Sequence, residues 1–143
     1  MKVLELANQY EPWIIEQRRY FHRYPELSME VFKTSEKISQ ILTELNIEHY
    51  RTGDVGVIAK IVGDFPGKTV MFRADIDALN VQQKNNVDYK STIDGRMHAC
   101  GHDGHIAINL GAIRILNELK EQIHGTVLFV FQPAEEVALG AKY

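Results

Sequence analysis

Residues 106–131 read IAINLGAIRILNELKEQIHGTVLFVF and divide into two parts that need different secondary structures. From Ile106 to Ile123 apolar side chains recur three and four positions apart, which predicts a long helix with a broad apolar face. Residues 126–131, which follow Gly125, are almost all apolar. This is typical of a strand buried on both faces of a parallel or mixed sheet. Another β-branched strand is expected at 68–74, so the order strand, helix, strand predicts an α/β fold.

Further elements are expected on the N-terminal side of this unit. An apolar face with helical spacing precedes Pro25, and a second helical stripe is expected to open at Ser28, which can act as its N-cap. A β-branched strand bounded by glycine is expected at 56–62, with a turn at 64–67 before the next strand. The polar stretch 80–104 is longer than most connections in compact domains, which favours a functional loop.

Composition limits the classes of function that the chain can have. The chain has 143 residues, 45% of them hydrophobic and 24% charged, which suits one globular domain or a piece of a larger one. Its net charge is −3 with the signs interspersed, so no nucleic-acid partner is expected. We find no apolar run of membrane-spanning length and no signal peptide. A single cysteine, Cys100, excludes an internal disulfide, and we expect a cytoplasmic protein.

Residue types that bind metals gather in three places along the chain. Asp75 and Asp77 end one expected strand, the segment 97–105 precedes the long helix, and Glu135 and Glu136 follow the last strand. In open α/β sheets, ligands bind in the crevice outside the carboxyl ends of the strands. We therefore expect these three groups of side chains to converge at one edge of the sheet.

The segment 97–105, MHACGHDGH, is the densest of the three. Thiolate, imidazole and carboxylate groups are the ligands that Zn²⁺ and similar ions take, and Cys100 and His102 can both turn toward one ion. We expect Asp103 to hold the second ring nitrogen of a ligand or a backbone amide. The alternative is a polar helix entry with a buried free cysteine, which explains one such residue more easily than the whole segment.

The acidic residues leave more alternatives open. Glu135 and Glu136 would point in opposite directions on an extended segment, so one could bind metal while the other acts as a general base. Taken alone, the pair is equally consistent with a solvated acidic loop. Asp75 and Asp77 occupy alternate positions at a strand end and could face the same way and share a role, or form an ordinary turn.

The other histidines carry weaker signals. His98 and His105 either contact a substrate or line the loop. His22, His49 and His124 have no partner residues nearby in the sequence, and we expect them to be structural or surface residues.

Four blocks of sequence, in the same order, resemble the M20 metallopeptidase family: FHRYPELS (21–28), FRADIDAL (72–79), MHACGHDGH (97–105) and FQPAEE (131–136). Within that family they are most similar to the amidohydrolases that act on N-acyl amino acids, the aminoacylase-like and hippurate-hydrolase-like branch. The resemblance implies the three-layer α/β sandwich of the zinc-dependent exopeptidases, with a mixed or parallel sheet and flanking helices. This chain is expected to hold a truncated part of that sandwich.

The resemblance also implies a site and a reaction. Two divalent metal ions (Zn, Mn, Co or Ni) would polarise the amide carbonyl of a small N-acyl amino acid and activate a water molecule. The products would be a free amino acid and a carboxylate. The metal ligands implied are Cys100, His102 and Glu136, with Glu135 as general base, and Asp77 as the catalytic acid that supports the metal centre beside the base (Asp75 is the weaker candidate).

The chain departs from the family in several respects. Family members are considerably longer, carry two more histidine ligands, and have a lid domain through which they form homodimers. We expect residues 1–143 to be the N-terminal part of the catalytic domain, without the lid. Asn80 stands where the family has proline, and 137–139 where it has glycine-rich residues. The alternatives are a non-catalytic remnant that binds metal or a partner, and a small interaction module with solvated acidic residues.

Overall fold

The computed structural model describes residues 2–142, and its elements form one mixed sheet with helices packed on it. The strand order is β1-β2-β4-β3, in which β3 and β4 run parallel and the other neighbours antiparallel. The α/β fold with a mixed sheet and flanking helices is therefore confirmed. The elements are α1 (Lys2–Arg23), α2 (Phe32–Glu44), β1 (Glu48–Thr52), β2 (Gly56–Val62), β3 (Phe65–Asp75), α3 (His102–Glu118), η1 (Lys120–Gln122), β4 (His124–Gln132) and η2 (Gly140–Lys142).

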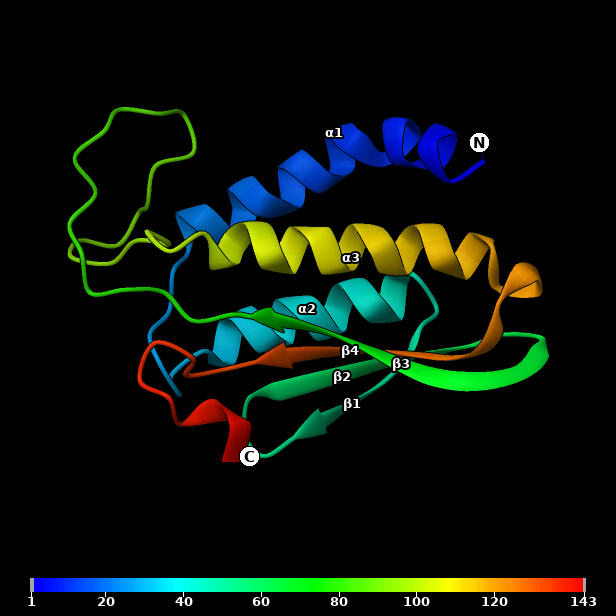
Figure 1. The fold of residues 1–143 in the computed structure, drawn as a ribbon. Coiled ribbons are helices and arrows are strands. Elements are labelled where there is room, and N and C mark those ends of the chain that lie inside the picture. Colours follow the sequence, from blue (N-terminus) through cyan, green and yellow to red (C-terminus); the bar gives the residue numbers. More distant parts are fainter. Residues whose placement is uncertain (1, 143) are drawn as a thin grey trace.

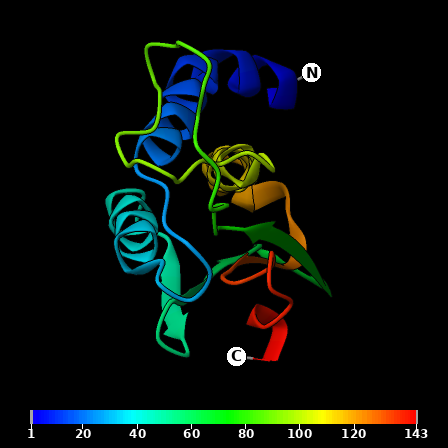
Figure 2. The same cartoon turned by 90° about the vertical axis from the view of Figure 1, so that its left-hand side faces the viewer.

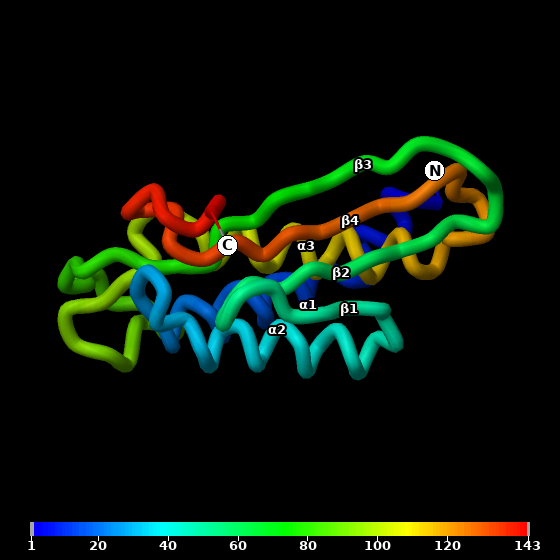
Figure 3. Tube along the Cα trace, turned by 90° about the horizontal axis from the view of Figure 1, so that it is seen from below, coloured from blue at the N-terminus to red at the C-terminus, as the bar shows by residue number. Residues whose placement is uncertain are grey.

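The three α-helices lie on the same side of the sheet (Figures 1 and 2). α2 and α3 pack against the strands, and α1 packs on α3 farther from the sheet. Seen from below, the strands lie in front of all three α-helices (Figure 3). Within residues 2–142, the α-helices therefore cover one face of the sheet, and the chain returns from β3 to the parallel β4 through α3.

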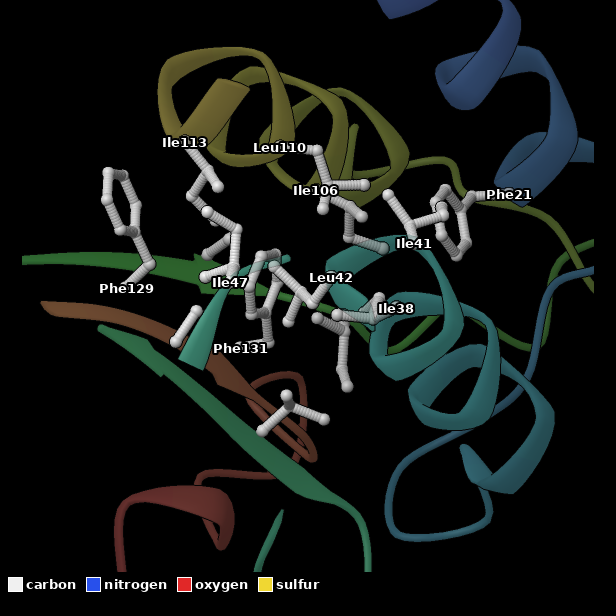
Figure 4. Packing of buried hydrophobic residues seen from close by; sticks show 14 of the residues in the cluster. Phe21, Ile38, Ile41, Leu42, Ile47, Ile106, Leu110, Ile113, Phe129 and Phe131 are labelled. Carbon is white, nitrogen blue, oxygen red and sulfur yellow. The ribbon is translucent and has the colours of Figure 1, made fainter. Parts of the chain in front are cut away.

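The core lies between α2, α3 and the covered face of the sheet (Figure 4). Burying side chains of this size contributes about 1.5–3 kcal/mol each, so this cluster holds the ends of β3, β4 and α3 in fixed positions. The central side chains are Ile38, Ile41, Leu42, Ile106, Leu110, Ile113, Phe129 and Phe131, each at most 3% exposed.

No helix among the described residues is both long enough and apolar enough to cross a membrane.

The start of α2 differs from the expectation that Ser28 caps it. Ser28 has a φ of 50°, and α2 begins only at Phe32, without a side-chain cap from the N-cap residue. The carboxylate of Glu26 supplies the missing acceptor, because it accepts hydrogen bonds from the backbone N–H groups of Thr34 (2.7 Å) and Lys33 (3.3 Å). A negative charge in this position also complements the helix dipole, so Glu26 has the capping role predicted for Ser28.

Two strands also differ from the sequence prediction. β1 was not predicted, because its residues are polar and mostly exposed and so lack an alternating pattern. β3 begins at Phe65 and not at Lys68, because Phe65 pairs with His124 and their rings stack at 4.7 Å. The turn predicted at 64–67 is correspondingly shorter.

The change that matters most for function is the start of α3. The sequence predicted a helix from Ile106, but α3 begins at His102, directly after Gly101 with its φ of 88°. Few residues other than glycine adopt this left-handed conformation. His102, Asp103 and His105 therefore lie on the first turn of a rigid helix and not in a loop.

Candidate metal centre

His102 lies at the centre of the site, on the first turn of α3, with only 2% of its surface exposed. Its Nδ1 is 2.8 Å from the backbone carbonyl oxygen of Asp77. A carbonyl only accepts hydrogen bonds, so Nδ1 carries the proton and Nε2 keeps its lone pair. A histidine that donates one ring N–H to a backbone carbonyl and presents its other nitrogen is oriented as metal-ligating histidines are.

Three carboxylates surround this Nε2. The nearest oxygens are those of Glu135 (3.6 Å), Glu136 (3.7 Å) and Asp75 (4.0 Å). The sulfur of Cys100, Nε2 of His102 and a carboxylate oxygen of Glu136 all lie within 4.8 Å of one another. The ends of β3 and β4 and the start of α3 thus bring the three groups of residues together, as their positions after the strands predict.

Asp77 joins the two halves of the site. Its carboxylate oxygens accept hydrogen bonds from the backbone N–H groups of Glu135 (3.1 Å) and Glu136 (3.2 Å), while its carbonyl holds His102. Burial raises the pKa of Asp77, and the two N–H donors oppose that rise. Asp75 lies instead on the Nε2 side of His102, so the two aspartates do not share one role, in contrast to the expectation from their spacing.

The segment with Glu135 and Glu136 is a turn, not the extended strand from which opposite side-chain directions were inferred. Ala134 has a φ of 53°, and both carboxylates reach the same side of His102. Gly140 makes the turn possible, because a Cβ on Gly140 would lie 1.6 Å from the carbonyl oxygen of Pro133. The turn therefore delivers two acids to one place.

Asp103 has a different partner from the one predicted. Its Oδ2 is 2.9 Å from Nδ1 of His22 and 3.3 Å from Nε of Arg18, both on α1. His22 and Asp103 are buried, so this pair fixes α1 against the first turn of α3. His22 could not be assigned this role from its neighbours in the sequence. The signal available was Arg18 and His22 four residues apart on one helix face, where an acid from another element can meet both.

The remaining histidines separate into buried and exposed ones. His98 is buried, neither ring nitrogen has a hydrogen-bond partner, and burial lowers its pKa to about 4. His98 thus lines the interior, while His105, with 49% of its side chain exposed, faces the site. His49 bonds the carbonyl of Ile47, and His124 stacks on a phenylalanine, in keeping with structural positions.

Cys100 is exposed at the edge of the site. A hydrogen bond to Glu136 raises the pKa of the thiol, and burial and the charges of Glu136, Glu135 and Asp75 raise it further. A divalent cation reverses this, because a coordinating thiol is deprotonated. The negative charges around Cys100 therefore disfavour a free thiolate but favour a thiolate that is bound to a cation.

The residues fit a divalent metal ion. Oδ1 of Asp75 and Oε1 of Glu136 are buried and have no hydrogen-bond partner, and clustered carboxylates repel unless a cation lies between them. Thiolate, imidazole and carboxylate donors suit Zn²⁺ and neighbouring transition metals. Within residues 2–142, two overlapping groups of side chains are close enough to hold such an ion: Cys100 with His102 and Glu136, and Asp75 with His102 and His105.

Known proteins match both the sequence and the structure. The sequence pattern of peptidase family M20/M25/M40 matches residues 71–143. N-acetylcysteine deacetylase of Bacillus subtilis is 45% identical over 131 residues, which is 90% of this chain and 34% of the relative. N-acyl-L-amino acid amidohydrolase of Geobacillus stearothermophilus is 38% identical, over 97% of this chain and 38% of its own length.

The fold matches a solved member of the family. A crystal structure from Bacillus subtilis, described as a dinuclear metal binding peptidase from the M20 family, superposes with a TM-score of 0.91 and 43% identity, over 94% of this chain and 38% of that one. The chain thus spans about a third of the length of the proteins it matches.

Proposed function

The chain belongs to peptidase family M20/M25/M40, and from this premise we propose that it carries metal ligands and the general base of an enzyme that hydrolyses the amide bond of N-acyl amino acids. The observation that carries the proposal is the meeting of Cys100, His102 and Glu136 within 4.8 Å, with Glu135 beside them. The names of two relatives, a deacetylase and an amidohydrolase of N-acyl amino acids, support this substrate class.

In this proposal Cys100, His102 and Glu136 are the metal ligands. A relative of known structure is described as binding two metal ions, and we extend that number to the complete site to which this chain contributes. Such ions polarise the amide carbonyl and lower the pKa of a water molecule, and Zn, Mn, Co and Ni all suit the donors.

Glu135 is the general base. It takes a proton from the attacking water and later gives it to the nitrogen of the leaving amino acid, so the amide C–N bond breaks and a carboxylate forms. Its side chain is more exposed than that of Glu136, which suits a group that meets water and substrate. Asp77 is a positioning residue, because its carboxylate holds the Glu135–Glu136 turn and its carbonyl orients His102.

The proposal extends to location and assembly. In this proposal residues 1–143 are the N-terminal part of a catalytic domain, and the complete protein is a homodimer. A thiolate ligand such as Cys100 survives best in a reducing compartment, which supports a cytoplasmic location. The partner is a small N-acyl amino acid.

Two variants with opposite expectations test the proposal. After loading with Zn²⁺ and removal of free metal, Glu136→Ala protein should keep at least tenfold less bound metal than wild type. In the complete protein, Glu135→Gln should keep its metal and lose roughly 10²–10⁴-fold in the metal-dependent release of amino acid from N-acetyl and N-benzoyl amino acids. Glu121→Ala, an exposed acid far from the site, is the control. Unchanged metal content in Glu136→Ala would contradict the ligand assignment, and unchanged hydrolysis in Glu135→Gln the base.

A further inference from the structure

His102 presents one lone pair to two different groups of ligands. Its Nδ1 is occupied by the carbonyl of Asp77, so only Nε2 can bind a metal ion. Among the described residues His102 belongs to two candidate groups, one with Cys100 and Glu136 and the other with Asp75 and His105. One nitrogen lone pair binds one ion, so an ion held by His102 must take its other ligands from one group or divide them between the two.

We propose that Asp75, His102 and His105 form a thiolate-free metal position, which takes the ion when the Cys100 thiolate is not available. The proposal deepens the proposed function, because it rests on His102 as a metal ligand. It adds His105 and Asp75 as ligands that the thiolate site does not require.

The first argument is the arrangement of the two histidines. His102 and His105 are three residues apart on the first turn of α3, so they lie on the same face of the helix. Their rings stack with centroids 5.4 Å apart and planes tilted by 27°. Because α3 is rigid, both imidazoles are held side by side above the end of β3.

The second argument is the carboxylate between them. Oδ2 of Asp75 lies 3.7 Å from Nδ1 of His105 and 4.0 Å from Nε2 of His102. Ligand atoms on one tetrahedral ion, with bonds of about 2.1 Å, lie roughly 3.5 Å apart. Both distances from Asp75 are therefore slightly too long for hydrogen bonds and close to the spacing that an ion would impose, and the ligand atoms of all three residues lie within 4.8 Å of one another.

The third argument is that Asp75 is buried with an unsatisfied oxygen. Its side chain is 9% exposed, and Oδ1 has no hydrogen bond. Arg73 is its neighbour, with Nη2 3.3 Å from Oδ1 and 3.4 Å from Oδ2, but that side chain is half exposed and such ion pairs contribute little. A buried carboxylate that is so weakly paired favours a cation beside it.

The two positions differ in the ions that they prefer. The group with Cys100 contains a soft thiolate, whereas Asp75 and His105 offer a hard oxygen and an imidazole. Cys100 is exposed, so oxidation or alkylation can remove the thiolate without disturbing α3. The ion would then keep His102 as a ligand and take Asp75 and His105 as the others.

Titration of the 143-residue chain with Co²⁺ tests the proposal, because thiolate–cobalt charge-transfer absorption and visible d–d absorption report the two ligand types separately. Wild type should show the charge-transfer band. Cys100→Ser and Cys100→Ala should lose that band and still bind Co²⁺, with an affinity lower by about tenfold. Adding His105→Ala to Cys100→Ser should weaken binding by at least a further tenfold, whereas His105→Ala alone should change the wild-type affinity less than threefold.

Controls separate this inference from the proposed function. His102→Ala should abolish both absorptions, and His124→Ala, at the far end of β4, should change neither. Far-UV circular dichroism establishes that each variant is folded, and His105 is exposed enough to be replaced without loss of packing. If Cys100→Ser binds Co²⁺ no better than His102→Ala, or if His105→Ala has no effect in that background, the second position does not exist while the thiolate site stands. If wild type lacks the charge-transfer band, the thiolate ligand of the proposed function fails instead.

Discussion

The two sides of the first turn of α3 hold the same kinds of residue, but a carboxylate faces basic side chains on one side and other carboxylates on the other. Asp103 points toward α1, where the buried His22 and the half-exposed Arg18 meet Oδ2 of its carboxylate, while its Oδ1 has no hydrogen-bond partner. His102, one residue earlier, points toward the ends of the strands, where carboxylates face its Nε2 and two of their oxygens lack hydrogen bonds. We name these the closed side (Asp103, His22, Arg18) and the open side (His102, Asp75, Glu135, Glu136, Cys100).

The difference teaches how to separate structural from functional charges in this protein. Consecutive residues of a helix point about 100° apart, so His102 and Asp103 cannot serve the same surroundings. Buried charges that are paired stabilise an arrangement, whereas buried charges that repel persist only where something else binds them. The closed side should therefore matter for folding and the open side for binding.

The largest effect is expected on the closed side. Asp103→Ala should lower the free energy of unfolding by about 3 kcal/mol or more, because it leaves His22 buried without its partner. Urea denaturation followed by circular dichroism measures the loss. Asp88→Ala, an exposed aspartate in the loop, is the matched control and should change stability by less than about 0.5 kcal/mol. A loss below about 1 kcal/mol for Asp103→Ala would place Asp103 with the open side.

An acid-induced loss of stability is expected from His98, which lies in the same interior. Burial lowers its pKa to about 4, and the charges of His22 and His102 add to this while Asp103 opposes it. Above the ordinary pKa of about 6.5, His98 is neutral in both the folded and the unfolded chain, so its burial does not make stability depend on pH. As the pH falls from about 6.5 to about 4, His98 binds a proton in the unfolded chain but not in the folded chain. The free energy of unfolding therefore falls by about 3 kcal/mol.

The measurement is the free energy of unfolding of wild type and His98→Leu at several pH values across that range. His98→Leu removes the titrating group, so its curve should be flatter than that of wild type by about this amount. His124→Leu removes an exposed histidine and should keep the wild-type slope. Parallel curves for wild type and His98→Leu would mean that His98 accepts a proton in the folded protein.

A smaller effect is expected at Asp77, which holds His102 and the Glu135–Glu136 turn of the open side together. Asp77→Asn keeps one acceptor oxygen but turns an NH₂ group toward one of the backbone N–H groups of Glu135 and Glu136. We expect a loss of about 1–2 kcal/mol in stability, the cost of one buried donor without a partner. We also expect weaker Co²⁺ binding, because the turn with Glu136 is no longer held. Normal metal affinity in the variant would show that the turn keeps its shape without Asp77, and Asp64→Asn controls for the change of charge.

The sequence predicted the fold where periodicity was strong. The apolar face of α3 and the apolar run of β4 were clear, since both pack on the core, and their order required a parallel crossover. β1 gave no signal because its side chains are solvated. The first turn of α3 was assigned to a loop because a helix entry rich in Gly, His and Asp lacks apolar spacing.

The sequence predicted which residues gather at the site but not which contacts they make. Position just after a strand or just before the crossover helix was enough to expect Cys100, His102 and Glu136 together. The partner of Asp103 was not predictable, because His22 lies eighty-one residues away and the contact depends on how α1 crosses α3. The predicted direction of the Glu135 side chain was wrong, because the turn is held by hydrogen bonds to Asp77 that no local sequence pattern reveals.

The smallest effect on stability, and one of opposite sign, is expected on the open side. Glu136→Gln removes one of the carboxylates around His102, so without metal the repulsion among them falls and stability should rise by about 0.5–1 kcal/mol. The same change should weaken Co²⁺ binding at least tenfold, because an amide oxygen is a poorer ligand than a carboxylate. Thermal unfolding in EDTA and cobalt titration measure the two quantities, with Glu121→Gln as an exposed control. A gain in stability together with a loss of binding is characteristic of residues kept for function at the expense of the fold. A variant that is destabilised and binds Co²⁺ as wild type does would move Glu136 to the closed side, and the contrast between the two sides would then rest on Asp75 and Glu135 alone.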